Sequence, residues 1–402
     1  MIRRIFILLL GAISLFGTAC RRIEEPSGTV TLTFRVGEPA TRAETPGDGN
    51  VADGGGIYCT ASGTAPDITV TPDLVIFIAN ETGIVKRFPD EGTVVETDYV
   101  DGATSGVGAA TSLSISFNFT AAEVGSYSVF ALANINGTGG NLSIPDLSSI
   151  TTISQLNDLK IGLADSGSPT VGDRMPLSAM GTLQVAQGLY GKFNGLLELE
   201  MLRCVAKVQL KFKNLTGAPL DLHNCQIDFK DMNTKQAWFF SRDPDFVELG
   251  DTDPSDGKDD NYRNYTSETA NINSLTGFPA VDDPNTTSVD EREKNAFIGP
   301  LLFFPSIAPQ QTKPSAGKRY LCDISFRVKK DAAPLYKPDD PNTYDEKTFS
   351  NLPIHNYYSQ DILALKRNQY LQIETTISKG LNVSFNFIVN NWEVHNPKVT
   401  FN

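Results

Sequence analysis

The side chains that could bind a metal or act as a catalytic base are few and widely spaced. His223, His355 and His395 are the only histidines, and none has the HExxH or HxH spacing that brings two ligands to one metal. The glycine run at 54–56 is not followed by Lys-Ser or Lys-Thr, so it does not match a phosphate-binding loop. The sequence therefore predicts no catalytic set, no metal centre and no cofactor, and it favours structural roles for the histidines.

One acidic run has the composition of a calcium-binding loop but the wrong spacing. It begins at Asp251, and its glycine, Gly257, comes one place too late. Tyr262 stands where such a loop needs a bidentate glutamate. Nothing marks a carboxylate pair here as buried, which a raised pKa would require. We interpret the run as a solvated turn.

Four cysteines follow the N-terminal segment, at Cys59, Cys204, Cys225 and Cys322. They form no CxxC motif and no Cys/His pair with metal spacing. Cys204 and Cys322 stand in alternating apolar segments, where a buried thiol behaves as a small hydrophobic residue. Buried, unreactive thiols are the expectation, and the sequence leaves open whether any pair forms a disulfide.

The N-terminus has the organisation of a bacterial export signal. Two arginines at positions 3 and 4 precede an apolar stretch at 5–16, and residues 17–19 fit a small-residue cleavage site. That stretch is shorter than the ~20 residues of a membrane-spanning helix. Cys20 follows directly, where a bacterial lipoprotein carries its lipid. The sequence predicts a signal peptide at 1–19 and lipidation of Cys20; cleavage after Ala19 without lipid is the alternative, because Gly17 replaces the usual lipobox leucine.

The charge balance argues against nucleic acid as a partner. The chain of 402 residues has 34 Lys and Arg against 47 Asp and Glu, a formal net charge of −13, and no long basic block. Phosphate binding needs clustered cations, so a field of this sign indicates an acidic, solvated surface.

Period-two alternation dominates the chain and predicts an all-β protein. In residues 29–36, Val30, Leu32, Phe34 and Val36 point one way with Thr and Arg between them. Residues 206–212 alternate as cleanly, with a lysine-rich face expected in water. Further strands are expected at 74–79, 113–119, 127–134, 320–328, 371–377 and 383–389.

Turn residues divide these strands into two tandem β-sandwiches with Greek-key or similar connections. One short helix is expected within 148–163, capped by Ser154 or Thr151. Residues 37–72 are interpreted as a flexible stretch, and 243–295 and 331–348 as polar insertions. The expected division is a segment at 20–42 carrying the first strand, an N-terminal sandwich at 43–190 and a C-terminal sandwich at 191–402.

Several separated segments together resemble the fimbrillin family. Residues 202–208 are similar to its pattern Leu-x-Arg-x-Val-Ala-Lys-Val, and 175–178 to its Met-Pro-Met-Ser segment. Residues 127–134 resemble a strand ending in Ala-Asn, and 367–370 an Arg-Asn-x-x-Tyr motif shortened by one residue. Trp392-Glu393 resembles the tryptophan near the C-terminus. The order and spacing of these pieces, over nearly the whole chain, carry the resemblance.

The resemblance implies a type V pilin precursor with two transthyretin-like domains. Such pilins are exported to the outer membrane as lipoproteins, and an arginine-specific protease removes their first strand. Here Thr41-Arg42-Ala43 follows the strand at 29–36, in a segment flanked by Pro and Gly that a protease could reach. The implied product is a stalk or tip subunit of a cell-surface fimbrium that begins at Ala43.

The resemblance also implies that the C-terminal segment is the donor strand for a neighbouring pilin subunit. Trp392 and Val394 share one parity, and Val399 and Phe401 share the other. The face changes at Asn396-Pro397, which favours two short strands joined by a bend. The partners implied are other pilin subunits, the protease, the outer membrane through the lipid, and a host or bacterial surface ligand.

Two functions of other classes stay open at this point. A surface lipoprotein that binds glycan would need an exposed aromatic platform, for which 238–240 and Tyr357-Tyr358 are the candidates. A secreted hydrolase is disfavoured, because the sequence offers no coherent catalytic set. Cleavage at Arg42 with polymer formation would separate a pilin from both.

Overall fold

The computed structural model describes residues 27–36, 55–63, 68–98, 100–101, 107–136, 140–164, 169–170, 174–187, 193–233, 235–241, 266–280, 296–308, 319–355 and 361–391. Strands dominate these residues, and the α-helix among them, α2 (Ile153–Asn157), is short. The described 3₁₀ turns are η2 (Ala121–Glu123), η6 (Pro341–Thr343) and η7 (Lys379–Leu381). The predicted all-β class with a minor helix is confirmed. Within the described residues, no helix has the length and apolarity to cross a membrane.

The N-terminal half is built around one large, open sheet that folds over into a sandwich. Its strand order is β5-β4-β10-β13-β15-β1-β9-β6, and β14 pairs with β13 beside this path. One apolar cluster contains residues from β4 and β10 as well as from β1 and β9, so the two arms of the sheet share a core. The strands are β1 (Ser27–Val36), β4 (Leu74–Asn80), β5 (Gly83–Phe88), β6 (Thr93–Thr97), β9 (Ser112–Thr120), β10 (Gly125–Ala133), β13 (Leu177–Gln187), β14 (Phe193–Asn194) and β15 (Leu196–Arg203).

The C-terminal half is a sandwich of two four-stranded sheets. One has the order β20-β16-β25-β26 and the other β19-β17-β22-β23. Apolar residues of β16 and β25 share a cluster with residues of β17 and β22, so the core lies between the sheets. The strands are β16 (Ala206–Leu215), β17 (Leu220–Met232), β19 (Thr266–Phe278), β20 (Ala296–Phe303), β22 (Leu321–Lys329), β23 (Tyr344–Pro353), β25 (Gln369–Ser378) and β26 (Asn382–Asn391).

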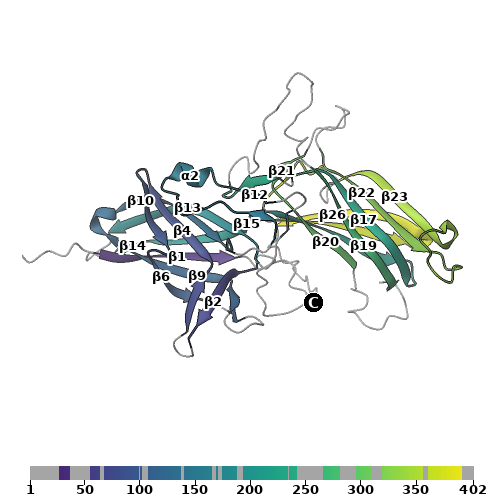
Figure 1. Cartoon of the computed structure of the whole chain (residues 1–402), viewed down its shortest axis with the longest axis horizontal. Coiled ribbons are helices and arrows are strands. Elements are labelled where there is room, and N and C mark those ends of the chain that lie inside the picture. Colours follow the sequence, from purple (N-terminus) through teal and green to yellow (C-terminus); the bar gives the residue numbers. More distant parts are fainter. Residues whose placement is uncertain are drawn as a thin grey trace, which may run out of the picture.

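The two halves lie end to end along the long axis of the molecule, with β12 between them (Figure 1). A three-stranded sheet, β11-β12-β18, joins the halves, because β18 belongs to the C-terminal half and pairs with β12 of the N-terminal half. The smaller sheets are β3-β2-β8-β7 and β21-β24. Their strands are β2 (Ile57–Ser62), β3 (Thr69–Pro72), β7 (Val100–Asp101), β8 (Val107–Ala110), β11 (Leu142–Ser143), β12 (Lys160–Leu163), β18 (Gln236–Trp238), β21 (Ser306–Ile307) and β24 (Ala364–Leu365).

The structure corrects the predicted helix cap and two of the predicted loops. The cap of α2 is Thr152, whose side chain accepts from the backbone of Gln155 while Gln155 reaches back to the cap. Neither Thr151 nor Ser154 has this reciprocal arrangement, which defines a capping box. The stretch at 37–72 contains β2 and β3, and the insertion at 243–295 contains β19, because cross-strand pairing overrides their polar composition.

The strand expected to begin the C-terminal sandwich lies instead in the N-terminal sheet. β15 is parallel to β1 over Thr31–Val36 and pairs with the start of β13. Its inward residues Leu199 and Met201 are buried in the N-terminal core. A further correction concerns β16, where Lys207 was expected in water and is only 3% exposed, with its ammonium 5.6 Å from the centre of the Tyr370 ring.

Candidate assembly site

β1 lies inside a sheet, with both of its backbone edges paired. On one side it runs parallel to β15, with Thr31 opposite Leu196 and Val36 opposite Met201. On the other it runs antiparallel to β9, from Ser27 opposite Thr120 to Arg35 opposite Ser112. Removing β1 would therefore expose two rows of unpaired backbone groups facing one slot, which is a template for another strand.

The inner face of β1 is apolar and buried, as its alternation predicts. Val30, Leu32 and Phe34 have no exposed surface, and Val36 is 4% exposed. All four belong to the apolar cluster of the N-terminal sandwich. Because burying a side chain of this size contributes roughly 1.5–3 kcal/mol, the strand is a large part of the core.

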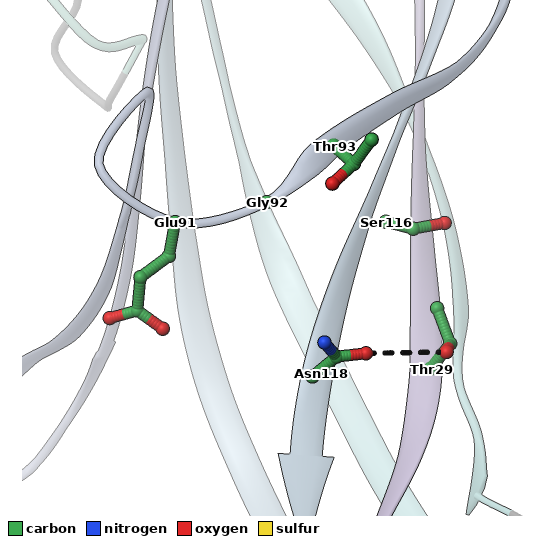
Figure 2. A pocket seen from close by; sticks show the side chains of 6 residues that line it. All are labelled: Thr29, Glu91, Gly92, Thr93, Ser116 and Asn118. Atoms are coloured by element: carbon green, nitrogen blue, oxygen red, sulfur yellow. Dashed lines mark hydrogen bonds between the residues drawn. The ribbon is translucent and has the colours of Figure 1, made fainter.

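The outer face of β1 forms a row of polar pairs with β9, which we call the hydroxyl ladder. Its three rungs are Thr33–Ser114 at 2.9 Å between hydroxyl oxygens, Thr31–Ser116 at 3.0 Å, and the Thr29 hydroxyl donating to Asn118 Oδ1 at 3.4 Å. The last of these is drawn in Figure 2. Cross-strand hydroxyl pairs of this kind stabilise one register of a sheet.

A polar groove of about 440 Å³ lies beside the outer end of the ladder (Figure 2). Its walls carry hydroxyl, amide and carboxylate groups, from Thr29, Glu91, Gly92, Thr93, Ser116 and Asn118. The turn that forms it requires a glycine, because Gly92 has a φ of 98° and an added Cβ would lie 2.9 Å from the Phe117 ring. This groove lacks the apolar walls typical of a small-molecule pocket.

The β15 side of the slot is acidic and closely apposed to β1. Arg35 Nη2 lies 3.3 Å from Glu198 Oε1, in an exposed pair of the kind that contributes little to stability. Glu200 is exposed on the same strand. The Thr31 amide donates to the Gly195 carbonyl at 3.2 Å, and a Cβ on Gly195 would lie 2.8 Å from Val30 Cγ1. Glycine at 195 therefore permits the close approach of the two strands.

The residues predicted for processing and donation lie outside the described residues. They are Cys20, Arg42, Ala43, Trp392, Val394, Val399 and Phe401. The acidic run at 251–257, His395 and Tyr357-Tyr358 lie outside them as well. Of the elements in the processing hypothesis, the structure therefore describes β1 and its place in the sheet.

A buried polar cluster lies between the two sandwiches. We call it the joint, and it consists of Arg203, Arg367 and Asn368 with the carbonyl groups of Trp238 and Phe239. The Arg203 side chain is fully buried, and its Nη1 donates to Asn368 Oδ1 at 2.8 Å. Arg367 is 5% exposed and donates to the carbonyl oxygens of Phe239 at 2.8 Å and Trp238 at 2.7 Å. Buried charged donors need such acceptors, because an unpaired group would carry its full desolvation cost.

The joint was not predicted from the sequence, although its residues lie in segments that carry the family resemblance. Segments 175–178, 202–208 and 367–370 supported the family resemblance, but no role was assigned to them. In the structure they converge: Arg367 Nη1 lies 3.3 Å from Ser178 Oγ, and Arg203 meets Asn368. The available signal was an arginine at 203 inside an apolar run, which predicts a buried charge with a dedicated partner.

Asn134 holds the end of β10 in the same way. It has a positive φ of 60°, which Asn tolerates better than most residues. Its side-chain amide donates to the carbonyls of Gly56 and Met175, both at 2.9 Å, and its Oδ1 accepts from the Tyr58 amide at 2.7 Å. The Ala-Asn end of the strand thus joins β10 to two other segments, one at Gly56–Tyr58 and one at Met175.

Of the aromatic residues considered for glycan binding, those at 238–240 are mostly buried. Phe239 has no exposed surface and Phe240 is 4% exposed. The ring of Trp238 is half-buried and is covered by the ammonium of Lys160 at 4.7 Å. Of residues 238–240, only the Trp238 ring is partly exposed, so the three do not form an exposed aromatic platform.

The described cysteines and histidines are embedded as structural residues. Cys59, Cys204, Cys225 and Cys322 are all buried, as predicted. Burial raises the pKa of Cys59, Cys225 and Cys322 to about 12, so their reactive thiolate forms are suppressed. His223 stacks on Tyr336 at 3.8 Å. Among the described residues, no group of three or more His, Cys, Asp or Glu could hold a metal ion.

Comparison with solved structures finds fimbrial proteins that match over most of the chain at low sequence identity. The tip fimbrial protein Mfa3 from Porphyromonas gingivalis, with C-terminal truncation, shares 12% identity; the match covers 90% of this chain and 100% of that chain, with a TM-score of 0.44. A fimbrilin from Porphyromonas gingivalis W83 shares 12% identity over 93% of this chain and 99% of that chain, with a TM-score of 0.45. No curated protein sequence matches significantly.

A family model matches residues 24–398, which is most of the chain. The match includes β1, both sandwiches and every segment that carried the resemblance to the fimbrillins. That resemblance is confirmed. The chain belongs to the family described as fimbrillin-A associated anchor proteins Mfa1 and Mfa2.

Proposed function

We propose that this protein is a structural subunit, stalk or tip, of a cell-surface fimbrium, and that it polymerises by strand exchange through the β1 slot. The observation that carries the proposal is the placement of β1. It is paired on both edges and buried on its inner face, and it is the first strand that the structure describes. Release of β1 would open a preformed site for an extended strand.

In this proposal a protease cuts after Arg42, and the mature subunit begins at Ala43. Before the cut, Cys20 carries a lipid that holds the precursor at the outer membrane. The cut separates β1 from the rest of the sheet while leaving the chain from β2 onward intact. An arginine-specific protease is the partner that the family resemblance implies, and Arg42 is the only basic residue in the sequence between Val36 and Lys86.

The strand that refills the slot is proposed to come from the C-terminal segment of another subunit. β26 is the last described strand and lies at the edge of its sheet, paired with β25. The residues that follow it, 392–402, include four apolar side chains that a neighbouring subunit could bury: Trp392, Val394, Val399 and Phe401. Each such side chain would contribute roughly 1.5–3 kcal/mol when buried in a neighbour. No catalytic step is part of this proposal.

An anchor role is the second candidate, and the family description favours it. An anchor subunit would keep its lipid and its own β1, so its slot would stay filled. Both roles use the same fold, and they differ in the covalent state of the segment at 20–42. Thr41-Arg42-Ala43 favours the processed form.

Mass spectrometry of the N-terminus of assembled protein tests the proposal. A mature chain beginning at Ala43, with 402 − 42 = 360 residues, is the expected result. Arg42→Ala should block processing while the precursor still folds, because β1 then stays in its slot. Assembled protein found only with lipid-linked Cys20 would establish the anchor role instead.

Deleting 392–402 should abolish polymerisation but leave the N-terminal sandwich folded, and full-length fibres from this truncated protein would argue against C-terminal donation.

A further inference from the structure

The last five residues of the chain repeat the side-chain pattern of the middle of β1. Residues 31–35 read Thr-Leu-Thr-Phe-Arg, and residues 398–402 read Lys-Val-Thr-Phe-Asn. In both, an aliphatic and an aromatic residue alternate with polar ones, and the central Thr-Phe pair is identical. The two segments could therefore present the same two faces as strands.

The slot makes different demands on the two faces of its occupant. On the inner face, Leu32 and Phe34 fill sites with no access to solvent, so the order of a medium and a large apolar side chain matters. On the outer face, the Thr33 hydroxyl meets Ser114, which is itself only 5% exposed. A short hydroxylated side chain fits this position better than a long or an apolar one.

The acidic side of the slot adds a preference for a cation. Glu198 lies opposite Thr33 in the register of β1 and β15, and Arg35 reaches it diagonally from two residues further on. A lysine two residues before the central threonine would stand at the matching diagonal on the other side of Glu198. Lys398 has this position relative to Thr400.

We propose, on the basis of the strand exchange proposed above, that residues 398–402 of a second copy of this chain take the places of residues 31–35, in the same direction and register. Val399 then occupies the Leu32 site and Phe401 the Phe34 site. Thr400 faces Ser114, and Lys398 faces Ser116 and the acidic side of the slot. Ser114, Ser116 and Glu198 are thereby the residues that select the register of the incoming strand, and the subunit is complementary to itself.

Other placements of the same segment fit the slot less well. A slip of one residue turns Val399 and Phe401 to the outer face. A reversed strand centred on Thr400 places phenylalanine in the Leu32 site and valine in the Phe34 site, which overpacks one and leaves a cavity in the other. A slip of two residues toward Thr29 places Phe401 in the Leu32 site and Thr400 opposite Ser116.

Disulfide trapping between two variants reads the register directly. Each variant carries one new cysteine, so only contacts between copies give a cross-linked pair, and the described native cysteines are buried. Processed Ser116→Cys protein is mixed with Lys398→Cys protein during assembly, and Ser114→Cys with Thr400→Cys. Facing residues of paired strands have Cβ atoms roughly 4.5–5.5 Å apart, close enough for a disulfide after small adjustments. Each variant assembled alone is the control.

The expected result is cross-linking of both pairs, with none between Ser116→Cys and Asn402→Cys. Cross-linking of Ser116→Cys to Asn402→Cys would show a reversed strand, and its linkage to Thr400→Cys would show a two-residue slip; either overturns the proposed register. Fibres that form without any of these links would place another strand in the slot, while leaving strand exchange intact. If unmodified protein forms no fibres through its C-terminal segment, the proposed function itself fails.

Discussion

β1 and β16 are counterparts in the two sandwiches. Each is a ten-residue strand between one parallel and one antiparallel neighbour: β15 and β9 for β1, β25 and β20 for β16. Each buries an alternating apolar face, with Phe34 and Phe212 both fully enclosed. The difference is in the connections, because β16 continues into β15 and β17 at its two ends, whereas no described strand precedes β1. Of the two strands, only β1 could leave the sheet after a single cut.

The side chains on the outer faces also connect β1 less firmly to its neighbours than they connect β16. β1 meets its neighbours through short hydroxyl side chains and one exposed ion pair. On β16, Lys207 is buried over Tyr370, Gln209 accepts from the Tyr370 hydroxyl at 2.7 Å, and Lys211 lies 3.4 Å from Glu374. Long side chains that interlock tie β16 to one partner, whereas short ones can be reproduced by another strand of similar pattern. These outer-face contacts agree with the proposal that β1, and not β16, is the strand that is exchanged.

The largest expected difference between β1 and β16 comes from truncating the buried phenylalanine of each strand. Phe34→Ala and Phe212→Ala should each destabilise the intact precursor by roughly 3–5 kcal/mol, because both side chains are fully buried. In assembled fibres only Phe212→Ala should lower stability, since Phe34 would no longer be present. Urea unfolding of precursor and fibre measures both effects. Fibres weakened by Phe34→Ala would mean that β1 remains in the assembled subunit.

The joint provides the next contrast, because it should stay intact in every state. Arg367→Ala removes the donors to the carbonyls of Phe239 and Trp238 and leaves them buried, which should cost about 3 kcal/mol. Arg35→Ala is the control, since its exposed pair with Glu198 contributes less than about 1 kcal/mol. Denaturant unfolding of the precursor should show this ordering, and the cost of Arg367→Ala should persist after processing, when Arg35 is no longer present. If both substitutions lowered the free energy of unfolding equally, the buried hydrogen bonds of the joint would not stabilise the protein more than an exposed ion pair does.

The hydroxyl ladder should contribute a smaller, measurable coupling. Thr31→Val and Ser116→Ala each remove one side of a 3.0 Å contact. A double-mutant cycle on the precursor should give a coupling of about 1 kcal/mol. Additive effects would show that the hydroxyls are adjacent without stabilising the register.

The smallest expected effect is a pH dependence confined to the end of the slot. Burial of Glu123 opposes its ionisation, but hydrogen bonds from Lys86 and Thr120 outweigh this and lower its pKa below the ordinary 4.5. A lowered folded pKa stabilises above the unfolded value, and the contribution is lost as pH falls through the folded one. Glu123→Gln should therefore reduce stability at neutral pH and flatten its decline below about pH 4.5. Parallel pH profiles of the two proteins would exclude this role.

Alternation along the chain was sufficient to predict the strands with one buried face. β1 and β16 were found this way because a period of two is a local property of the sequence. Their neighbours were not predictable, since the parallel partner of β1 lies at Leu196–Met201 and pairing at such distance leaves no local signature. This is also why β15 was assigned to the wrong sandwich.

The joint and the hydroxyl ladder could not be predicted for a related reason. Arg203 and Asn368 are 165 residues apart, and Thr31 and Ser116 are 85 apart. Each residue type alone is unremarkable on a strand, and only the three-dimensional register gives it a partner. β19 was missed because its polar composition resembles a loop, while pairing with β17 makes it a strand.

Locking β1 in its slot tests the central claim most directly. Thr31→Cys with Ser116→Cys, at a pair whose hydroxyl oxygens are 3.0 Å apart, should form a disulfide between β1 and β9. Cleavage at Arg42 would then leave the strand covalently held, and the locked protein should form no fibres until a reductant releases it. Fibre formation at the normal yield with the disulfide intact would contradict assembly through the β1 slot.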